Sequence, residues 1–156
     1  MKVECEYVED KCMKGSIFFA NGERYEGDIK NARAKGQGTM TFLDGSVYTG
    51  AWNKGKQHGQ GQLNFRDGSK YVGRFRKNDF TPDGIMHFLN GVTYQGSYQK
   101  NRPHGQGTLS DPEKGKFVGE FREGKQLKGE HIFPDGTRIP VKENDYNRED
   151  RTEEEL

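Results

Sequence analysis

Histidine followed by glycine is the first pattern in this sequence that could carry chemistry. His58 and His104 each begin a His-Gly-Gln-Gly string, and His-Gly loops supply oxyanion-binding N–H groups in some esterases. Those enzymes also need a nucleophile on a Gly-x-Ser-x-Gly turn, which this sequence lacks. Because the two histidines occupy equivalent positions of a repeat, we interpret them as structural and predict that the protein is not an enzyme.

Phosphate and metal sites are not indicated either. The string GKQHGQG around His58 lacks the terminal Gly-Lys-Ser/Thr of a phosphate-binding loop. His87 and His131 have no convergent set of ligands. Carboxylate or amide side chains recur at one turn position of the repeat, in Asn21, Asp44, Asp67, Asn90 and Asp135. Turn formation explains this pattern without calcium, and we expect no metal and no cofactor.

Cys5 and Cys12 are the only cysteines. Two cysteines without a neighbouring histidine make neither a disulfide scaffold nor a four-ligand zinc site. We therefore predict free thiols in a reducing compartment. No apolar run approaches the roughly 18 residues that span a bilayer, and the first residues show no signal-peptide pattern. The expected location is the cytoplasm.

The composition excludes a thick core. Of the 156 residues, 29% are hydrophobic and 31% are charged, yet 12% are aromatic and 22 are glycine. Such a chain cannot fill two packed layers, while its aromatic content argues against disorder. The formal net charge is +1. Residues 143–156 contain seven acids and two bases, so the rest of the chain is mildly basic.

A repeat of 23 residues organises most of the chain. Units begin at Tyr25, Tyr48, Tyr71 and Tyr94, and Phe117 takes the same position in a fifth unit. A fixed period of about 20 to 50 residues indicates a stacked repeat array. We therefore predict three regions, which are a variable N-terminal cap (1–14), the repeat array (15–140, with a half-unit at 15–24) and an acidic C-terminal tail (141–156).

Each unit is predicted to be a β-hairpin. Tyr48, Gly50 and Trp52 alternate with polar residues, as on one face of a half-buried strand. A tight turn is expected at residues 53–56 and another at 66–69. Aromatic rings from neighbouring strands are expected to lie over the strand glycines Gly50, Gly59 and Gly61. The predicted fold is all-β, an antiparallel meander of hairpins.

Three departures from the pattern predict local irregularity. Thr81-Pro82-Asp83 replaces the His-Gly-Gln segment, which predicts a bulge in the unit from Tyr71. The unit from Tyr94 continues as SDPEKGK, which predicts a short second strand. The repeat is expected to stop after Ile139 and Pro140, because proline continues a strand ladder poorly.

The assembled pattern resembles the MORN repeat (membrane occupation and recognition nexus). The matching segments are Tyr-x-Gly-x-Trp from 48, His-Gly-x-Gly from 58 and Asp-Gly-Ser-x-Tyr from 67. The resemblance implies an elongated, twisted single-layer antiparallel sheet with aromatic residues along a groove, and repeats without catalytic activity. The FPDG string from 133, followed by Ile139-Pro140, is similar to retinophilin-like MORN proteins. That similarity implies an adaptor that holds the tail of a class III myosin.

The aromatic residues are the candidate partner-binding groove, because a single-layer sheet has no second layer to cover them. We expect the groove to hold an extended peptide or an amphipathic helix of a partner protein. Its predicted residues are Tyr25, Tyr48, Trp52, Phe65, Tyr71, Phe75, Tyr94, Tyr98, Phe117 and Phe121.

An anionic membrane is the alternative partner. Basic residues near the predicted turns are its candidate contacts, namely Lys54, Lys56, Arg74, Arg76 and Lys100. Either function implies association with the cytoskeleton or a membrane. Nucleic acid is not expected, because acids are interspersed among the bases. The exposed edges of a meander also allow end-to-end dimers, and the acidic tail could compete with a partner for the basic body.

Overall fold

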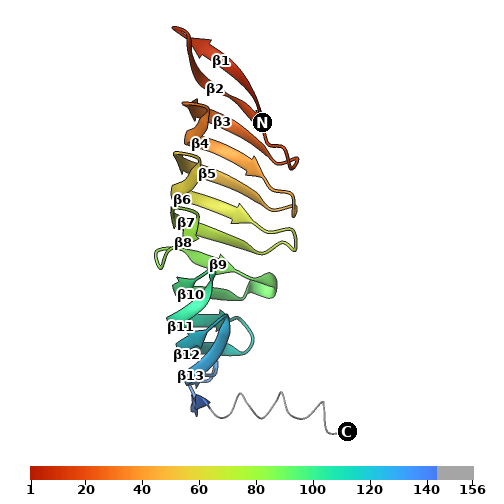
Figure 1. The fold of residues 1–156 in the computed structure, drawn as a ribbon. Coiled ribbons are helices and arrows are strands. Elements are labelled where there is room, and N and C mark those ends of the chain that lie inside the picture. Colours follow the sequence, from red (N-terminus) through yellow and green to blue (C-terminus); the bar gives the residue numbers. More distant parts are fainter. Residues whose placement is uncertain (144–156) are drawn as a thin grey trace. The chain divides into compact units, whose positions relative to one another are not determined.

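The computed structural model describes residues 1–143, and these residues form an all-β structure. The chain divides into two compact units, Met1–Met86 and His87–Leu156. Within each unit, successive strands pair side by side in sequence order (Figure 1), except that β8 and β9 both pair with β7, so each unit is a single-layer meander. This confirms the predicted fold class. The expected acidic tail, beyond its first residues, lies outside the described part of the chain.

The first unit holds the N-terminal hairpin and the hairpins from Tyr25, Tyr48 and Tyr71. Its strands are β1 (Lys2–Val8), β2 (Lys11–Phe18), β3 (Arg24–Lys30), β4 (Arg33–Thr41), β5 (Val47–Asn53), β6 (Lys56–Asn64), β7 (Lys70–Arg76) and β8 (Asp79–Phe80), and β9 (Ile85–His87) begins at its end. In the hairpin from Tyr48, Tyr48 pairs with Leu63 and Gly50 with Gly61. The pairing then shifts at a bulge before Trp52 pairs with Gln57. The hairpins from Tyr25 and Tyr94 share this register, so the same repeat positions face each other in all three.

The second unit continues the same connectivity. It begins with a short 3-10 helix, and its elements are η1 (Leu89–Gly91), β10 (Thr93–Gln99), β11 (Arg102–Asp111), β12 (Gly115–Arg122), β13 (Lys125–Ile132) and β14 (Arg138–Val141). In residues 1–143, no helix is long and apolar enough to cross a membrane.

Both kinds of predicted turn are confirmed. Lys54 and Gly55 have φ of 49° and 78°, the paired positive values of a two-residue hairpin turn whose twist matches the strands. At the other end of the hairpin, the Asp67 carboxylate accepts hydrogen bonds from the Ser69 N–H (2.8 Å) and hydroxyl (2.6 Å). The hydroxyl bond, and then the N–H bond, hold the pKa of Asp67 below its usual range. This carboxylate therefore stabilises a turn, as predicted.

The turn between β3 and β4 carries a strained residue. Asn31 and Ala32 have φ of 52° and 58°, and this left-handed conformation costs a residue with a Cβ about 1–2 kcal/mol. We expect Ala32→Gly to raise the free energy of unfolding by about 1 kcal/mol, measured by urea denaturation, since glycine's greater freedom in the unfolded chain offsets part of the gain. Ala20→Gly is the matched control, because Ala20 lies in a turn without positive φ. An equal effect at both positions would contradict this account.

Tyrosine rings cover the strand glycines, but not at every predicted position. A Cβ built on Gly61 would meet the Tyr48 hydroxyl and lie 2.6 Å from Tyr48 Cζ, as predicted. A Cβ built on Gly50 would first meet the backbone of the paired strand, at the Gly61 Cα and then at the Gln60 carbonyl oxygen (2.6 Å), with the Tyr48 hydroxyl 3.0 Å away. Gly59 touches no ring. A Cβ there would lie 3.0 Å from the Ala51 Cβ, and the residue has φ of 103°, so both the close approach of Ala51 and the backbone conformation favour glycine.

The N-terminal residues form a complete hairpin, β1–β2. Gly15 pairs with Cys5 on one side and Gly27 on the other, while Ile17 pairs with both Val3 and Tyr25. Cys5 and Val3 therefore stand where the repeat places glycine and tyrosine. The cap continues the sheet without the tyrosine-over-glycine packing of the other hairpins.

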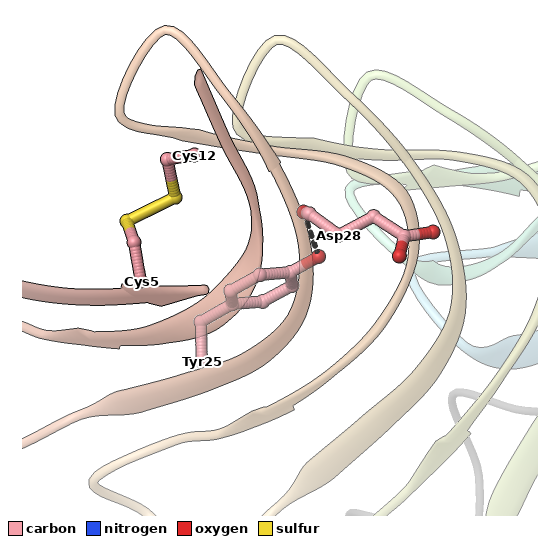
Figure 2. The surroundings of a disulfide bond; sticks show 4 residues. All are labelled: Cys5, Cys12, Tyr25 and Asp28. Carbon is pink, nitrogen blue, oxygen red and sulfur yellow. Dashed lines mark hydrogen bonds between the residues drawn. A yellow bond between two sulfur atoms is a disulfide. The ribbon is translucent and has the colours of Figure 1, made fainter. Parts of the chain in front are cut away.

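The prediction of free thiols is wrong, because Cys5 and Cys12 form a disulfide (Figure 2). The turn at Glu9 and Asp10 folds β1 against β2 and brings the two Cα atoms to 5.3 Å, a separation that a disulfide spans. The sequence did not show this proximity, since residues 1–14 lie outside the recognisable repeat. Figure 2 shows the bond beside β3, near Tyr25 and Asp28.

The three predicted irregularities have different outcomes. The strand that should follow β7 is broken into β8 and β9 around Thr81-Pro82-Asp83, as expected. The short second strand predicted for the unit from Tyr94 is wrong, because β11 has ten residues and pairs with β12 as far as Asp111 and Gly115. The repeat was expected to stop after Pro140, and β14 ends one residue later, at Val141. Pro140 lies within this strand, which an edge strand allows because one side of its ladder is unpaired.

Candidate protein-binding surface

The first ring of each repeat is fully buried. Tyr25, Tyr48, Tyr71, Tyr94 and Phe117 are at most 1% exposed. Each tyrosine hydroxyl donates to the carbonyl three residues later, for example from Tyr48 to Ala51 at 2.7 Å and from Tyr94 to Ser97 at 2.7 Å. The ring thus lies flat across its own hairpin, over glycines that leave room for it, and its polar end is satisfied.

The second ring of each repeat packs edge-on against the first. Trp52 lies between Tyr25 and Tyr48, with ring centroids 5.2 and 5.0 Å away and both pairs nearly perpendicular. Its indole N–H donates to the Gly38 carbonyl at 3.0 Å. Phe75 stands in the same way against Tyr48 and Tyr71, so the rings form a continuous core within a single layer.

This packing corrects the predicted groove. Rings on a sheet without a second layer were expected to stay open, but these rings cover one another and the backbone. Of the ten predicted groove residues, only Phe65 and Tyr98 are more than marginally exposed, and both are half-buried. The other eight, Tyr25, Tyr48, Trp52, Tyr71, Phe75, Tyr94, Phe117 and Phe121, are core residues that a partner cannot reach in the folded protein.

Burial raises the pKa of Tyr48 and Tyr94 to about 12, and it raises the pKa of Tyr25 and Tyr71 in the same direction. Tyrosines in the unfolded chain have a pKa of about 10. The folded protein therefore keeps these phenols neutral at a pH where the unfolded chain ionises. Their stabilising effect is complete below pH 10 and is lost as the pH rises towards 12.

We therefore expect cooperative alkaline unfolding between about pH 10 and the folded-state values. Tyrosinate absorbance and far-ultraviolet circular dichroism, recorded on the same samples, should change together because ionisation of these rings requires the sheet to open. Complete tyrosine ionisation with the β-sheet spectrum intact would show that the rings are not buried as described.

A third aromatic row is partly exposed, and Phe65 is its one member among the predicted groove residues. The row comprises Phe19, Phe42, Phe65 and Phe88, each six residues before a unit start, and Phe133, which begins a turn of the same kind after the start of the last unit. Phe19 is 36% exposed, Phe88 and Phe133 are each 38% exposed, and Phe42 and Phe65 are half-buried. The constant offset of the first four from the repeat tyrosines was the signal available in the sequence. We call Phe19, Phe42 and Phe65, in the first unit, the phenylalanine edge.

The turns at the opposite ends of the strands in the first unit form a basic surface. They carry seven bases and one acid within residues 30–35, 53–58 and 76–79. Lys30, Arg33, Lys35 and Lys54, with Asn31, surround a surface depression of ≈ 520 Å³, and none of these four bases forms an ion pair within residues 1–143. We call Lys30, Arg33, Lys35, Lys54, Lys56, Arg76 and Lys77 the basic edge.

The predicted membrane contacts fall into three places. Lys54, Lys56 and Arg76 belong to the basic edge. Arg74 is exposed in the middle of β7, where strand alternation turns it away from Tyr71 and Phe75, and Lys100 belongs to a turn of the second unit. The sequence therefore identified part of the edge, and missed Lys30, Arg33, Lys35 and Lys77 because it did not align the turns.

The histidines of the His-Gly strings have a structural role. His58 Nδ1 accepts a hydrogen bond from the Lys77 N–H (3.3 Å), and His104 Nδ1 accepts one from the Glu123 N–H (3.2 Å). Each ring thus caps the turn of the next hairpin, which explains why both recur at one repeat position. Within residues 1–143, no group of three or more histidine, cysteine, aspartate or glutamate side chains could hold a metal ion.

Comparison with known proteins agrees with this arrangement. A family model described as the MORN repeat matches residues 25–47, 48–70, 94–116 and 117–138. Residues 71–93, interrupted at Pro82, are not matched, although they keep the buried Tyr71 and Phe75. A comparison with curated proteins gave no match.

The chain is similar in fold to solved structures. One of them is the TCP domain of Drosophila melanogaster SAS-4, solved in complex with a proline-rich motif of Ana2. The two chains are 14% identical, and the match covers 86% of this chain and 74% of the other with a TM-score of 0.50. At this identity the similarity concerns the fold alone.

Proposed function

The chain belongs to the MORN-repeat family, and we propose that it is a non-enzymatic scaffold or adaptor that holds a segment of a partner protein. The observation that carries the proposal is the phenylalanine edge. Apolar rings left partly accessible at one position in three successive hairpins form a row, with Phe19 exposed and the other two half-buried, and rows of accessible apolar side chains on soluble proteins mark interaction surfaces. The complex of the SAS-4 domain with a proline-rich motif supports an extended partner segment.

This proposal moves the binding surface from the buried rings to the exposed ones. Phe65 belongs both to the predicted groove and to the phenylalanine edge. Binding through the remaining predicted rings would require the core to open, whereas the phenylalanine edge can be contacted in the folded state.

The test is affinity capture with purified folded protein, using wild type beside a variant with Phe19, Phe42 and Phe65 each replaced by serine. Val72→Ser is the matched control, because Val72 is 37% exposed and lies on the sheet face opposite Tyr71. Circular dichroism and melting curves confirm that each variant is folded. We expect the triple variant to lose the partners that the control retains. Unchanged partner sets in all three proteins would refute binding at this edge.

The tail of a class III myosin remains the partner implied by the resemblance to retinophilin-like proteins. A purified tail fragment, titrated against wild type and the same two variants, tests it directly.

A cytoplasmic location, in association with the cytoskeleton or a membrane, is proposed from the same resemblance. The disulfide removes the support that the cysteines gave to a reducing compartment, so the location rests on the resemblance.

The basic edge favours a second candidate function, docking on an anionic membrane. Each base near such a surface contributes about 1 kcal/mol, and salt weakens the attraction. Vesicles containing phosphatidylserine should float with wild-type protein at low salt, and not with a variant carrying glutamate at Lys30, Arg33, Lys35 and Lys54. Lys100→Glu, in the second unit, is the control. Flotation that is insensitive to salt and to the reversed charges would exclude this mode.

A further inference from the structure

The spacing of the phenylalanine edge selects one backbone conformation for its ligand. Phe19, Phe42 and Phe65 occupy one repeat position in successive hairpins, and each hairpin advances the sheet by two strands. At the usual separation of about 4.8 Å between strands, neighbouring rings repeat every ~9.6 Å across the sheet.

A polyproline II helix matches this distance. It has three residues per turn and rises about 3.1 Å per residue, so every third side chain returns to the same side after ~9.3 Å. An extended β-strand returns every second residue, after roughly 6.7 Å. In an α-helix a side chain returns to the same side after seven residues, or about 10.5 Å. Across the three rings, the side chains of a polyproline II ligand fall out of line with the rings by about 0.6 Å, and those of an α-helix by about 1.8 Å.

The charge of this edge points to a ligand with little charge. The three turns that carry the rings, residues 19–24, 42–47 and 65–70, contain three bases and three acids. Asp44 and Asp67 are engaged by the hydroxyl and N–H groups of Ser46 and Ser69. The opposite edge has seven bases and one acid, so an acidic segment would be drawn there instead. Leu43, which is 71% exposed, adds apolar surface beside Phe42.

From the spacing and the charge together, we propose that the phenylalanine edge binds an uncharged proline-rich segment in the polyproline II conformation. The segment runs across the strands and places one apolar residue against each of the three rings. Proline-rich segments are preformed in this conformation, so little ordering entropy opposes their binding to aromatic surfaces. This inference rests on the proposed scaffold function and specifies the chemistry of its partner.

The probe is a neutral fluorescent peptide of three Pro-Pro-Leu repeats. A second peptide has the same composition, with leucine at every second position of its first half. Fluorescence anisotropy with the full chain should show tighter binding of the first peptide. Phe42→Ser, in the centre of the row, should weaken that binding by roughly tenfold, while Val72→Ser should leave it unchanged. Phe19→Ser and Phe65→Ser, at its ends, should each weaken it less.

Equal affinity for the two peptides, or an affinity unaffected by all three phenylalanine variants, would overturn the inference. So would peptide binding that Val72→Ser abolishes, because Val72 lies on the other face. These failures differ from failure of the scaffold function. A partner captured by wild type and lost from the serine triple variant would retain the scaffold function even where the proline-rich peptide does not bind.

Discussion

Trp52→Ala should lower the free energy of unfolding by about 4 kcal/mol, within the range of about 3–5 kcal/mol for removal of a buried aromatic side chain. Trp52 is 7% exposed and contacts both Tyr25 and Tyr48 edge-on. A single-layer sheet cannot collapse a second layer into the space left behind. The variant also leaves the Gly38 carbonyl without its indole donor. Urea denaturation followed by circular dichroism measures the change, since Trp52 is the only tryptophan available to fluorescence.

Trp52→Phe is the control, because the next hairpin carries Phe75 at the same position and packs it against the same kind of rings. Phenylalanine keeps the edge-on contacts and loses the hydrogen bond, so we expect a loss of about 1 kcal/mol. A similar, small effect of alanine and phenylalanine would mean that Trp52 is not part of the core.

This prediction also decides how the binding function can be tested. Alanine at Trp52, Phe75 or Tyr98 would be a natural choice if these rings lined an open groove. Since Trp52 and Phe75 are buried, loss of a partner from such variants would report unfolding. The serine variants of the phenylalanine edge avoid this confusion, because their rings are partly exposed.

Gly61→Ala should destabilise the protein by about 3 kcal/mol, at the upper end of the usual range for overpacking. The added methyl group would meet the Tyr48 hydroxyl and approach Tyr48 Cζ to 2.6 Å. Tyr48 cannot yield easily, because it is fully buried and its hydroxyl is bonded to the Ala51 carbonyl. Thermal melting and urea denaturation measure the loss.

A double-mutant cycle separates this clash from a general preference against alanine. In a Tyr48→Ala background the ring is absent, so Gly61→Ala should cost much less than in the wild type. Gln60→Ala, at the exposed neighbouring residue, should change stability by less than about 0.5 kcal/mol. Equal costs of Gly61→Ala in both backgrounds would show that the Tyr48 ring is not the cause.

Much of the fold followed from the sequence, because its determinants are local. Asp67 and Gly68 fix one turn, and Lys54 with Gly55 fixes the other, within a few residues of each other. Alternation from Tyr48 to Trp52 defines the inward face of a strand. The disulfide was missed because Cys5 and Cys12 become neighbours through a hairpin that lacks the repeat's tyrosine and glycine. The length of β11 was missed because strand length depends on the partner strand, β12.

The candidate surface was harder to predict for the same reason. Sequence identifies which side chains share a face, but exposure is set by what the neighbouring hairpins place beside them. Trp52 is covered by the rings of two tyrosines, whereas Phe19 begins a turn at the edge and keeps about a third of its surface open.

The amino-acid sequence by itself determined the period of 23, the hairpin in each period, the turns and the inward face of the strands. These depend on backbone preferences and on side-chain alternation within one 23-residue repeat. Only the tertiary structure decided that the inward rings seal one another, that a row of phenylalanines remains open at one edge, and that seven bases meet at the other. Solvent exposure and charge clustering arise only when several hairpins lie side by side, so they cannot be read from a single 23-residue repeat.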